Sequence, residues 1–184
     1  AILDDGSLKC WGRNYFGELG NGGTTGSGVQ YTTPQAVDLG TGRTAVSVSA
    51  GQYHTCAVPD NGSLKCWGRN IYGELGIDST TSQNTPQLVN LGTGRTAVSV
   101  SAGHSHTCAA LDNNSLNCWG YNTYGVLGTG DTTDRTVPTH VNLFQTQSSL
   151  LGNISGCPLS TTPGKNYTIT GNNTYGSSNV TLYI

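Results

Sequence analysis

The chain has 184 residues, only 10% of which are charged, and its formal net charge is −2 at pH 7. This balance provides no basic surface for a nucleic acid and no polybasic patch for a membrane surface. No run of about 18 apolar residues is present, so we expect no membrane span, while the length suffices for one compact domain with a sizeable core.

One sequence motif occurs three times along the chain. It reads GSLKCWGRNYFGELG from Gly6, GSLKCWGRNIYGELG from Gly62 and NSLNCWGYNTYGVLG from Asn114. One tryptophan marks each copy: Trp11, Trp67 and Trp119. They are 56 and then 52 residues apart. A repeat of this length indicates a supersecondary unit that cannot bury its apolar face alone and must stack on its neighbours.

The repeats divide the chain into four parts. Residues 1–39 form an incomplete first unit, 40–91 a second unit and 92–143 a third, and 144–184 form a divergent tail rich in Ser, Thr and Asn. The first unit carries a glycine-rich run at 20–28 that accounts for its four extra residues. That run lacks the Gly-Lys-Ser/Thr ending of a phosphate-binding loop, so we interpret it as a surface insertion.

The second unit predicts four short strands. Residues 44–50 alternate small or polar with apolar side chains, 54–58 follow as a second strand and 63–67 as a third. After a glycine-punctuated loop, 85–91 form a fourth, outer strand with a proline near its start. No helical periodicity is visible. We therefore predict an all-β fold of about three propeller-type blades, each with four antiparallel strands, followed by a β tail.

The cysteine spacing predicts the register of the central hairpin. Placing Cys56 opposite Cys66 leaves a three-residue turn at 60–62, with Gly62 in the left-handed conformation. A two-residue Asn-Gly turn would put Cys56 opposite Trp67 instead. Cysteines that face each other on adjacent antiparallel strands lie within disulfide reach, so we predict a Cys56–Cys66 bond.

The third unit repeats this spacing. Cys108 and Cys118 are again ten residues apart, and Asn114 takes the position of the turn glycine. Asparagine is the non-glycine residue that best tolerates a positive φ. We therefore predict a second disulfide, Cys108–Cys118.

Two further cysteines mark incomplete units at the ends of the repeats. Ala1 aligns with Ala57, so the partner of Cys10 would precede the first residue. After Leu143 the expected run GTGRTAVSVSAG is replaced by FQTQSSLLGNISG, and Cys157 follows. Either the chain is part of a larger propeller, or Cys157 and Cys10 complete one hairpin, within one molecule as a ring or between molecules joined head to tail.

The tail predicts two more strands, at 166–170 and 178–184, because both segments alternate apolar and polar residues. The last strand could add to an open sheet edge of a partner, or it could pair locally as an ordinary final strand. The sequence alone does not decide between these two arrangements.

Six sequons and six cysteines indicate an extracellular or cell-surface location. Each sequon begins N-x-Ser/Thr with no proline between: Asn61, Asn113, Asn153, Asn166, Asn172 and Asn179. Four of the six lie beyond residue 150. We expect attached N-glycans and an oxidising compartment, against the alternative of chance triplets in a bacterial secreted protein.

No residue pattern predicts catalysis or a cofactor. His104 and His106 together with Cys108 and Cys118 could suggest zinc, but the spacing fits no standard zinc finger and oxidised cysteines cannot ligate. His54 occupies the same repeat position as His106, which favours a structural imidazole that satisfies backbone groups between blades. We predict that the protein is not an enzyme and binds no metal.

The segment HTCAVPDNGSLKCWGRNIYGELG, from His54 to Gly76, resembles the repeats of the regulator of chromosome condensation family. The resemblance covers residues 1 to about 143, and the cysteine pairs are similar to those of secreted, disulfide-bearing members. It implies propeller blades and a protein-binding scaffold. In the founding member it also implies nucleotide exchange on a small GTPase and chromatin binding.

Three functions follow as hypotheses. The first is a non-enzymatic extracellular structural or adhesive glycoprotein whose copies associate through their incomplete ends into filaments. The second is a fragment of a secreted seven-bladed module that binds a protein or carbohydrate. The third, most distant, is a guanine-nucleotide exchange factor. Peptide mass spectrometry without reductant would locate the Cys10 and Cys157 bonds and would separate the first two.

Overall fold

The computed structural model describes residues 1–26 and 29–142 in full, and the backbone of 166–173 and 176–183. The chain divides into two compact units, Ala1–Leu143 and Phe144–Ile184. All regular elements in the described residues are β-strands, and none of these residues forms a helix that is long and apolar enough to cross a membrane. The predicted all-β fold is confirmed.

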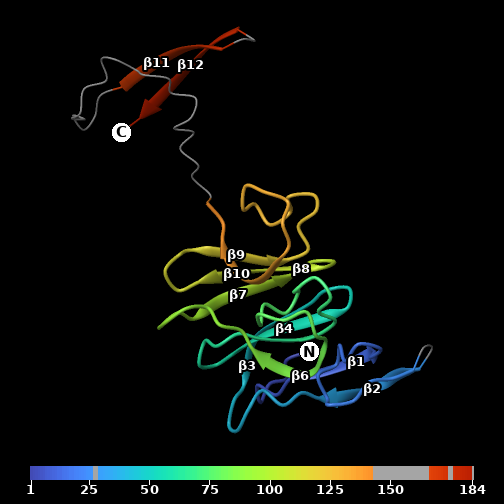
Figure 1. Cartoon of the computed structure of the whole chain (residues 1–184). Coiled ribbons are helices and arrows are strands. Elements are labelled where there is room, and N and C mark those ends of the chain that lie inside the picture. The colour runs from blue at the N-terminus through green and yellow to red at the C-terminus, as the bar shows by residue number, and fades with distance from the viewer. Residues whose placement is uncertain (27–28, 143–165, 174–175, 184) are drawn as a thin grey trace. The chain divides into compact units, whose positions relative to one another are not determined.

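The first unit contains two complete blades, of which the second blade lies between the first and the third (Figure 1). The second blade contains β3 (Ala45–Ala50), β4 (His54–Pro59), β5 (Lys65–Gly68) and β6 (Gln83–Leu88), hydrogen-bonded in chain order. The third blade repeats this arrangement with β7 (Ala97–Ala102), β8 (His106–Leu111), β9 (Leu116–Gly120) and β10 (Arg135–His140). Each is a four-stranded antiparallel sheet, as the repeat pattern predicts.

Of the first blade, the described residues form the two outer strands, β1 (Lys9–Arg13) and β2 (Gln30–Ala36). On the other edge of β1, Ala1 exchanges two backbone hydrogen bonds with Lys9, and Ile2 forms a bridge with Leu8. Beyond that pair, no described residue continues the ladder along β1. The edge that β4 covers in the second blade is therefore open in the first.

The hairpin register follows the cysteine spacing. Cys56 lies opposite Cys66, and the turn closes with a hydrogen bond from Gly62 N–H to the Pro59 carbonyl. Gly62 and Asn114 have φ values of 72° and 62°, so both occupy the left-handed region that favours glycine and tolerates asparagine. The three-residue turn is present in both complete blades.

The fourth strand differs from its predicted position at 85–91. It runs from Gln83 to Leu88, so Pro86 lies inside the strand and not near its start. The proline is tolerated because β6 is an edge strand whose register with β5 shifts between Cys66 and Gly68. Val89 is buried after the strand ends, which explains why the apolar alternation suggested a later strand.

The core lies between blades. One cluster packs Trp119 of the third blade against Leu75 and the Cys56–Cys66 pair of the second. A second cluster packs Trp67 of the second blade against Leu8 and neighbouring apolar residues of the first. Strands β3 and β4 also contact β7. The second and third blades thus each bury their tryptophan against the preceding blade, as expected for stacked repeats.

In the tail, β11 (Asn166–Asn173) and β12 (Gly176–Tyr183) pair with each other in antiparallel register. Ile169 lies opposite Val180. The last strand, β12, thus pairs locally with β11, which is one of the two arrangements that the sequence left open.

Candidate binding surfaces

The blade topology gives the repeat unit two chemically different ends. In an antiparallel sheet, successive connections alternate between the two ends of the strands. The β3–β4 and β5–β6 connections therefore lie at one end, and the 60–62 turn and the β6–β7 connection lie at the other. We call the first end the aromatic face, defined by residues 13–16, 52–53, 69–72, 104–105 and 121–126, and the second end the turn face.

A row of aromatic rings crosses all three blades on the aromatic face. Tyr15, Phe16 and Tyr53 are linked by ring-centroid distances of 4.7 Å and 5.6 Å. A second group contains Tyr72, Tyr121 and Tyr124. The ring centroids of Tyr72 and Tyr121 are 4.8 Å apart, and those of Tyr121 and Tyr124 are 6.1 Å apart. Tyr124 is 82% exposed, so the row remains open to solvent.

Two arginines fill the spaces between these rings. The Arg13 guanidinium lies 4.3 Å from the centroid of Tyr53, and the Arg69 guanidinium lies 5.1 Å from Tyr53 and 5.3 Å from Tyr72. Each arginine also pairs with a glutamate, Arg13 with Glu18 at 3.5 Å and Arg69 with Glu74 at 3.7 Å. Cation–π contacts and ion pairs thus hold the long arginine side chains in place.

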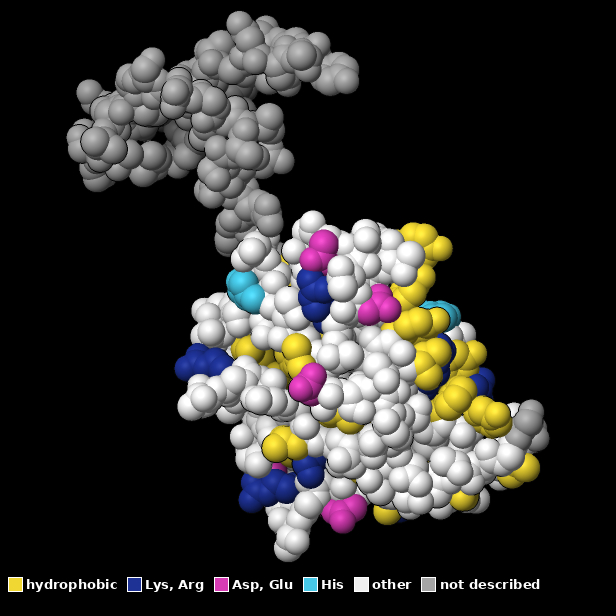
Figure 2. Space-filling model, viewed as in Figure 1, with side chains coloured by type: hydrophobic (Ala, Val, Ile, Leu, Met, Phe, Trp, Pro, Cys, Tyr) yellow, Lys and Arg dark blue, Asp and Glu magenta, His cyan; other side chains and the backbone are white. Residues whose placement is uncertain are grey.

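The aromatic face has the composition of a protein-binding surface. Tyrosine, phenylalanine and arginine are enriched at protein interfaces because they bury large areas at low entropic cost. Figure 2 shows hydrophobic side chains with basic and histidine side chains among them along one margin of the first unit. The sequence contained a signal for this surface, since the Phe16, Tyr72 and Tyr124 positions are aromatic in every copy of the motif, but we did not predict it.

The turn face carries the two sequons of the repeats. Asn61 and Asn113 are exposed, and the side-chain oxygen of each accepts hydrogen bonds from the backbone and hydroxyl of the serine two residues later. Ion pairs between Arg43 and Asp60 and between Arg95 and Asp112 brace the turns: they join residues 17 apart in each repeat. Of the other sequons, Asn153 lies outside the described residues. Only the backbone is described at Asn166, Asn172 and Asn179.

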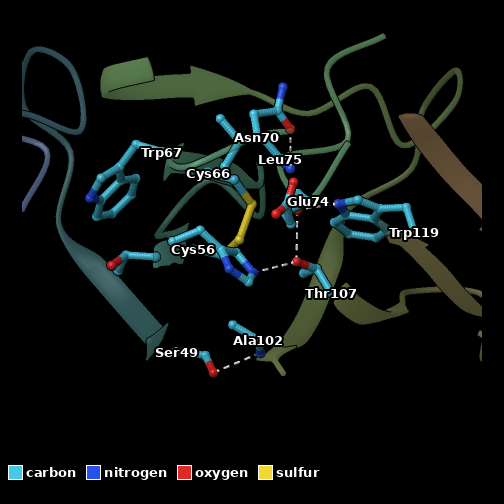
Figure 3. The surroundings of a disulfide bond; sticks show 12 residues. Ser49, Cys56, Cys66, Trp67, Asn70, Glu74, Leu75, Ala102, Thr107 and Trp119 are labelled. Carbon is cyan, nitrogen blue, oxygen red and sulfur yellow. Dashed lines mark hydrogen bonds between the residues drawn. A yellow bond between two sulfur atoms is a disulfide. The ribbon is translucent and has the colours of Figure 1, made fainter. Parts of the chain in front are cut away.

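The joint between neighbouring blades has a fixed set of parts. The indole N–H of Trp67 and the hydroxyl of Thr55 both donate to the Glu18 carbonyl of the first blade, at 2.9 Å and 2.8 Å. Trp119 and Thr107 donate in the same way to the Glu74 carbonyl (Figure 3). This shared acceptor satisfies both buried donors and fixes the tryptophan in the joint.

His54 contributes to the joint by a hydrogen bond to another side chain and not to a backbone group. Its Nε2 lies 2.9 Å from the Thr107 hydroxyl of the third blade. Because Thr107 donates its own proton to the Glu74 carbonyl, the imidazole must donate here. Burial, followed by the charges of His106 and Arg69, lowers the pKa of His54 to about 4. The expected structural role is thus realised with a hydroxyl partner instead of backbone groups.

The three tryptophans are not equivalent in their surroundings. Trp67 and Trp119 are 0% exposed, whereas Trp11 is 51% exposed. In the described residues, the tryptophan is therefore core between blades in the second and third units only. No described residue provides Trp11 with the carbonyl acceptor that the other two share.

Both predicted disulfide bonds are present in the structure. Cys56–Cys66 and Cys108–Cys118 each have a Cα–Cα distance of 4.1 Å. Cys10 is free and half-buried, and burial raises the pKa of its thiol. It borders a cavity of about 370 Å³ that Trp11, Glu18 and Val48 also line.

The remaining predicted site residues are Cys157 and the histidines and cysteines of the third unit. Cys157 lies outside the described residues. His104 approaches the Ser105 hydroxyl with its Nδ1, and the cysteines near it are in the disulfide, so their thiolates are not available as ligands. No cluster of three or more metal-ligating side chains occurs within residues 1–26 and 29–142.

Stacked four-stranded sheets with one tryptophan per joint define a propeller-type repeat protein. The family model described as the regulator of chromosome condensation (RCC1) repeat matches residues 5–58, 61–110 and 114–154. The chain therefore belongs to this family.

Similar proteins include the ultraviolet-B receptor UVR8 of Arabidopsis thaliana, 34% identical over 85% of this chain and 34% of the receptor. The human E3 ubiquitin-protein ligase HERC2 is 31% identical over 80% of this chain and 3% of the ligase. A crystal structure of Prp20p from Saccharomyces cerevisiae, a protein that binds Gsp1p and histones, matches with a TM-score of 0.71 and 26% identity over 82% of this chain and 37% of Prp20p. The chain thus spans about a third of UVR8 and of Prp20p.

Proposed function

We propose that this chain is a non-enzymatic, extracellular structural or adhesive glycoprotein whose copies associate head to tail. The observation that carries the proposal is the division of its surface. One face presents an arginine-braced aromatic row across three blades, and the opposite face presents the sequons. N-glycans on Asn61 and Asn113 would project away from the aromatic face, so that this face stays open to a partner.

Disulfide chemistry supports the extracellular location. Two bonds close short hairpins in the described blades, and such bonds persist in oxidising compartments. For head-to-tail association, the open edge of β1 and the free Cys10 beside it offer a place for an extended segment that carries a cysteine. We assign that segment to the region around Cys157 of another copy.

The first experiment is peptide mass spectrometry without reductant on protein from a eukaryotic secretory host. We expect a Cys10–Cys157 linkage that occurs only in species larger than a monomer, together with glycan mass on Asn61 and Asn113. A monomer with free thiols at both cysteines would contradict head-to-tail association. Unmodified sequons would remove the glycoprotein part of the proposal.

A second candidate is favoured by the match to Prp20p, which binds Gsp1p. A fragment of a larger binding propeller would present its aromatic face to a small GTPase, the partner that the family resemblance implies. Purified chain would then accelerate nucleotide release from a small GTPase, and Arg69→Ala would reduce that acceleration. Arg95→Ala, on the turn face, serves as the matched control. If the chain is a structural scaffold, the parent protein, Arg69→Ala and Arg95→Ala should all leave the rate of nucleotide release unchanged.

A further inference from the structure

The outermost strand of each blade is an edge strand, and an edge strand offers unpaired backbone groups to any other extended chain. In the second blade this strand is β6, which pairs with β5 on one side only. Its counterparts are β2 in the first blade and β10 in the third. All three strands carry a proline at the same position: Pro34, Pro86 and Pro138. What such an edge can bind depends on where this proline lies.

Pro86 lies where the backbone of β6 points away from its own sheet. Val89 N–H donates to the Leu64 carbonyl at 2.8 Å, so the backbone groups of Val89 point towards β5. Gln87 lies opposite Cys66 in the same register. Because backbone groups alternate in direction along a strand, those of residues 86 and 88 point outward. The ring of Pro86 therefore removes a donor that a partner strand would need.

The same geometry recurs in the other two blades. Val37 N–H donates to the Leu8 carbonyl at 3.0 Å, and Val141 N–H donates to the Leu116 carbonyl at 2.8 Å. Pro34 and Pro138 each lie three residues before these valines, as Pro86 lies before Val89. A proline is tolerated in a strand only at an outward position, so the prolines by themselves do not show that the edge is protected. The carbonyl groups beside them do.

The carbonyl before the proline is already bonded to a side chain of the same strand. The Gln87 Nε2 donates to the Thr85 carbonyl at 3.1 Å and to the Thr85 hydroxyl at 3.0 Å. In the first blade, the Gln35 Nε2 bonds the Thr33 carbonyl and hydroxyl in the same way, at 3.0 Å and 3.2 Å. The acceptor beside each proline is therefore occupied.

The third blade keeps this bond with different residues. Valine and threonine replace the threonine and glutamine on either side of the proline, and the Thr139 hydroxyl donates to the Val137 carbonyl at 3.1 Å. The bond is thus present in all three blades although the donor group changes from an amide to a hydroxyl.

A loop of the preceding blade covers the first half of the strand. Gly22 N–H donates to the Asn84 carbonyl at 2.9 Å, and the Asn84 Nδ2 donates back to the Gly22 carbonyl at 2.8 Å. Asp78 N–H donates to the Thr136 carbonyl of β10 at 3.0 Å in the same way. In the second half of β6, the outward groups that remain are the Pro86 carbonyl and those of Leu88, at the end of the strand. That stretch is too short for a ladder.

We propose that β2, β6 and β10 form a guarded rim, which prevents a second copy or an extended segment of another protein from pairing edge to edge with the blades. Charged side chains are a common protection of edge strands, and β2 and β6 contain none. Proline and the side-chain bonds to carbonyls take over that role. The inference concerns where partners are kept away, so it does not depend on head-to-tail association.

The test removes the guard from the central blade by combining Pro86→Val with Gln87→Val, which restores the outward N–H and frees the Thr85 carbonyl. Thr41→Val combined with Thr93→Val is the matched control, because it adds two exposed valines in turns outside any strand. Pro86→Val combined with Gln87→Lys frees the same edge but adds a charge that opposes pairing. An intact Cys56–Cys66 bond and an unchanged unfolding midpoint show that each variant is folded.

Sedimentation velocity measures association over a range of concentrations, and hydrogen exchange locates it. The double valine variant should associate at a concentration about tenfold or more below that of the parent protein, with slower exchange in β6. The lysine variant and the turn control should match the parent protein. Gln87→Val alone, which leaves the proline in place, should have a smaller effect in the same direction.

The guarded rim is overturned if the double valine variant associates no more readily than the parent protein, or if the turn control or the lysine variant associates equally well. It is also overturned if the parent protein associates with slower exchange in β6. A parent protein that stays monomeric would refute head-to-tail association and would leave the comparison between variants in force.

Discussion

At the scale of single residues, the joint between the second and third blades depends on a histidine that must stay neutral. His54 is almost fully buried and donates to Thr107, which in turn donates to the Glu74 carbonyl. An imidazolium in this position would carry a charge out of water with no anionic partner in contact. The chain of donors therefore makes the stability of this joint depend on pH.

The pH dependence has a definite sign. The pKa of His54 is about 4 in the folded protein and close to its usual 6.5 when unfolded, so the unfolded state binds more protons between these values. The stabilisation is present above pH 6.5 and is lost as the pH falls towards 4. Its full size is on the order of 3 kcal/mol. Urea unfolding of His54→Gln should show a shallower loss over this range than the parent protein.

His104→Gln is the matched control for that measurement, because His104 is exposed on the aromatic face. Its side chain has a hydrogen bond with its neighbour Ser105 and an edge-on contact with the Tyr53 ring, and it takes no part in the joint. It should retain the pH dependence of the parent protein. Equal slopes for the parent protein and His54→Gln would show that the buried imidazole does not determine the acid sensitivity.

At the scale of secondary-structure elements, glycines set how closely two blades approach. Gly76 has a φ of 68°, and a Cβ there would lie 2.6 Å from the Trp119 Nε1. Gly94, with a φ of 69°, has no neighbour within 4 Å of such a Cβ. The comparison of these two positions separates steric crowding from backbone strain.

We expect Gly76→Ala to destabilise the protein by about 2 kcal/mol more than Gly94→Ala does, because crowding adds to a strain that both share. Chemical unfolding monitored by tryptophan fluorescence measures the difference. Similar midpoints for the two variants would mean that the loop moves aside at little cost.

The hairpin disulfides should each stabilise their blade modestly, because each closes a short loop. Replacing Cys56 and Cys66 together with alanine should cost about 2–3 kcal/mol. Alanine is preferable to serine because both sites are completely buried and a hydroxyl would lack a partner. Cys10→Ala, which leaves both hairpin disulfides intact, should shift the unfolding midpoint of the monomer little. A double variant as stable as Cys10→Ala would contradict this role.

The elements of the complete blades could be predicted because local rules agree there. The cysteine spacing and the positive φ of Gly62 and Asn114 determine one hairpin register. The fourth strand was misplaced because burial of Val89 continues the apolar pattern beyond the last ladder hydrogen bond. The exposure of Trp11 depends on which blades meet in space, and repeat spacing alone does not contain that information. For the aromatic face, the ring at the Phe16, Tyr72 and Tyr124 positions was a usable signal that the spacing argument passed over.

At the scale of the whole molecule, stability should be uneven along the stack. All six residues of β4 are buried, whereas no residue of β1 is fully buried and one edge of that strand is open. In a stack of repeats, each blade is stabilised only by its immediate neighbours. The second blade has a neighbour on both sides and should be the last to open.

Hydrogen exchange measured by mass spectrometry checks this order. Amides of β4 and β5 should exchange most slowly, and those of β1, β2 and β10 should exchange faster. Addition of protein concentrated enough to associate should slow exchange at β1 selectively. Uniform protection over the first unit would instead indicate a single cooperative domain.

The same backbone hydrogen bond joins each blade to the next. Ala45 donates to the Gly6 carbonyl at 2.8 Å, and Ala97 donates to the Gly62 carbonyl at 2.8 Å. We therefore expect residues 44–95 to be exchangeable as one repeat unit. A second copy of this unit, inserted after residue 95, would meet the partners that the present one meets on each side. Duplication of this stretch of the gene would lengthen the protein by one blade, and the contacts between blades would stay the same.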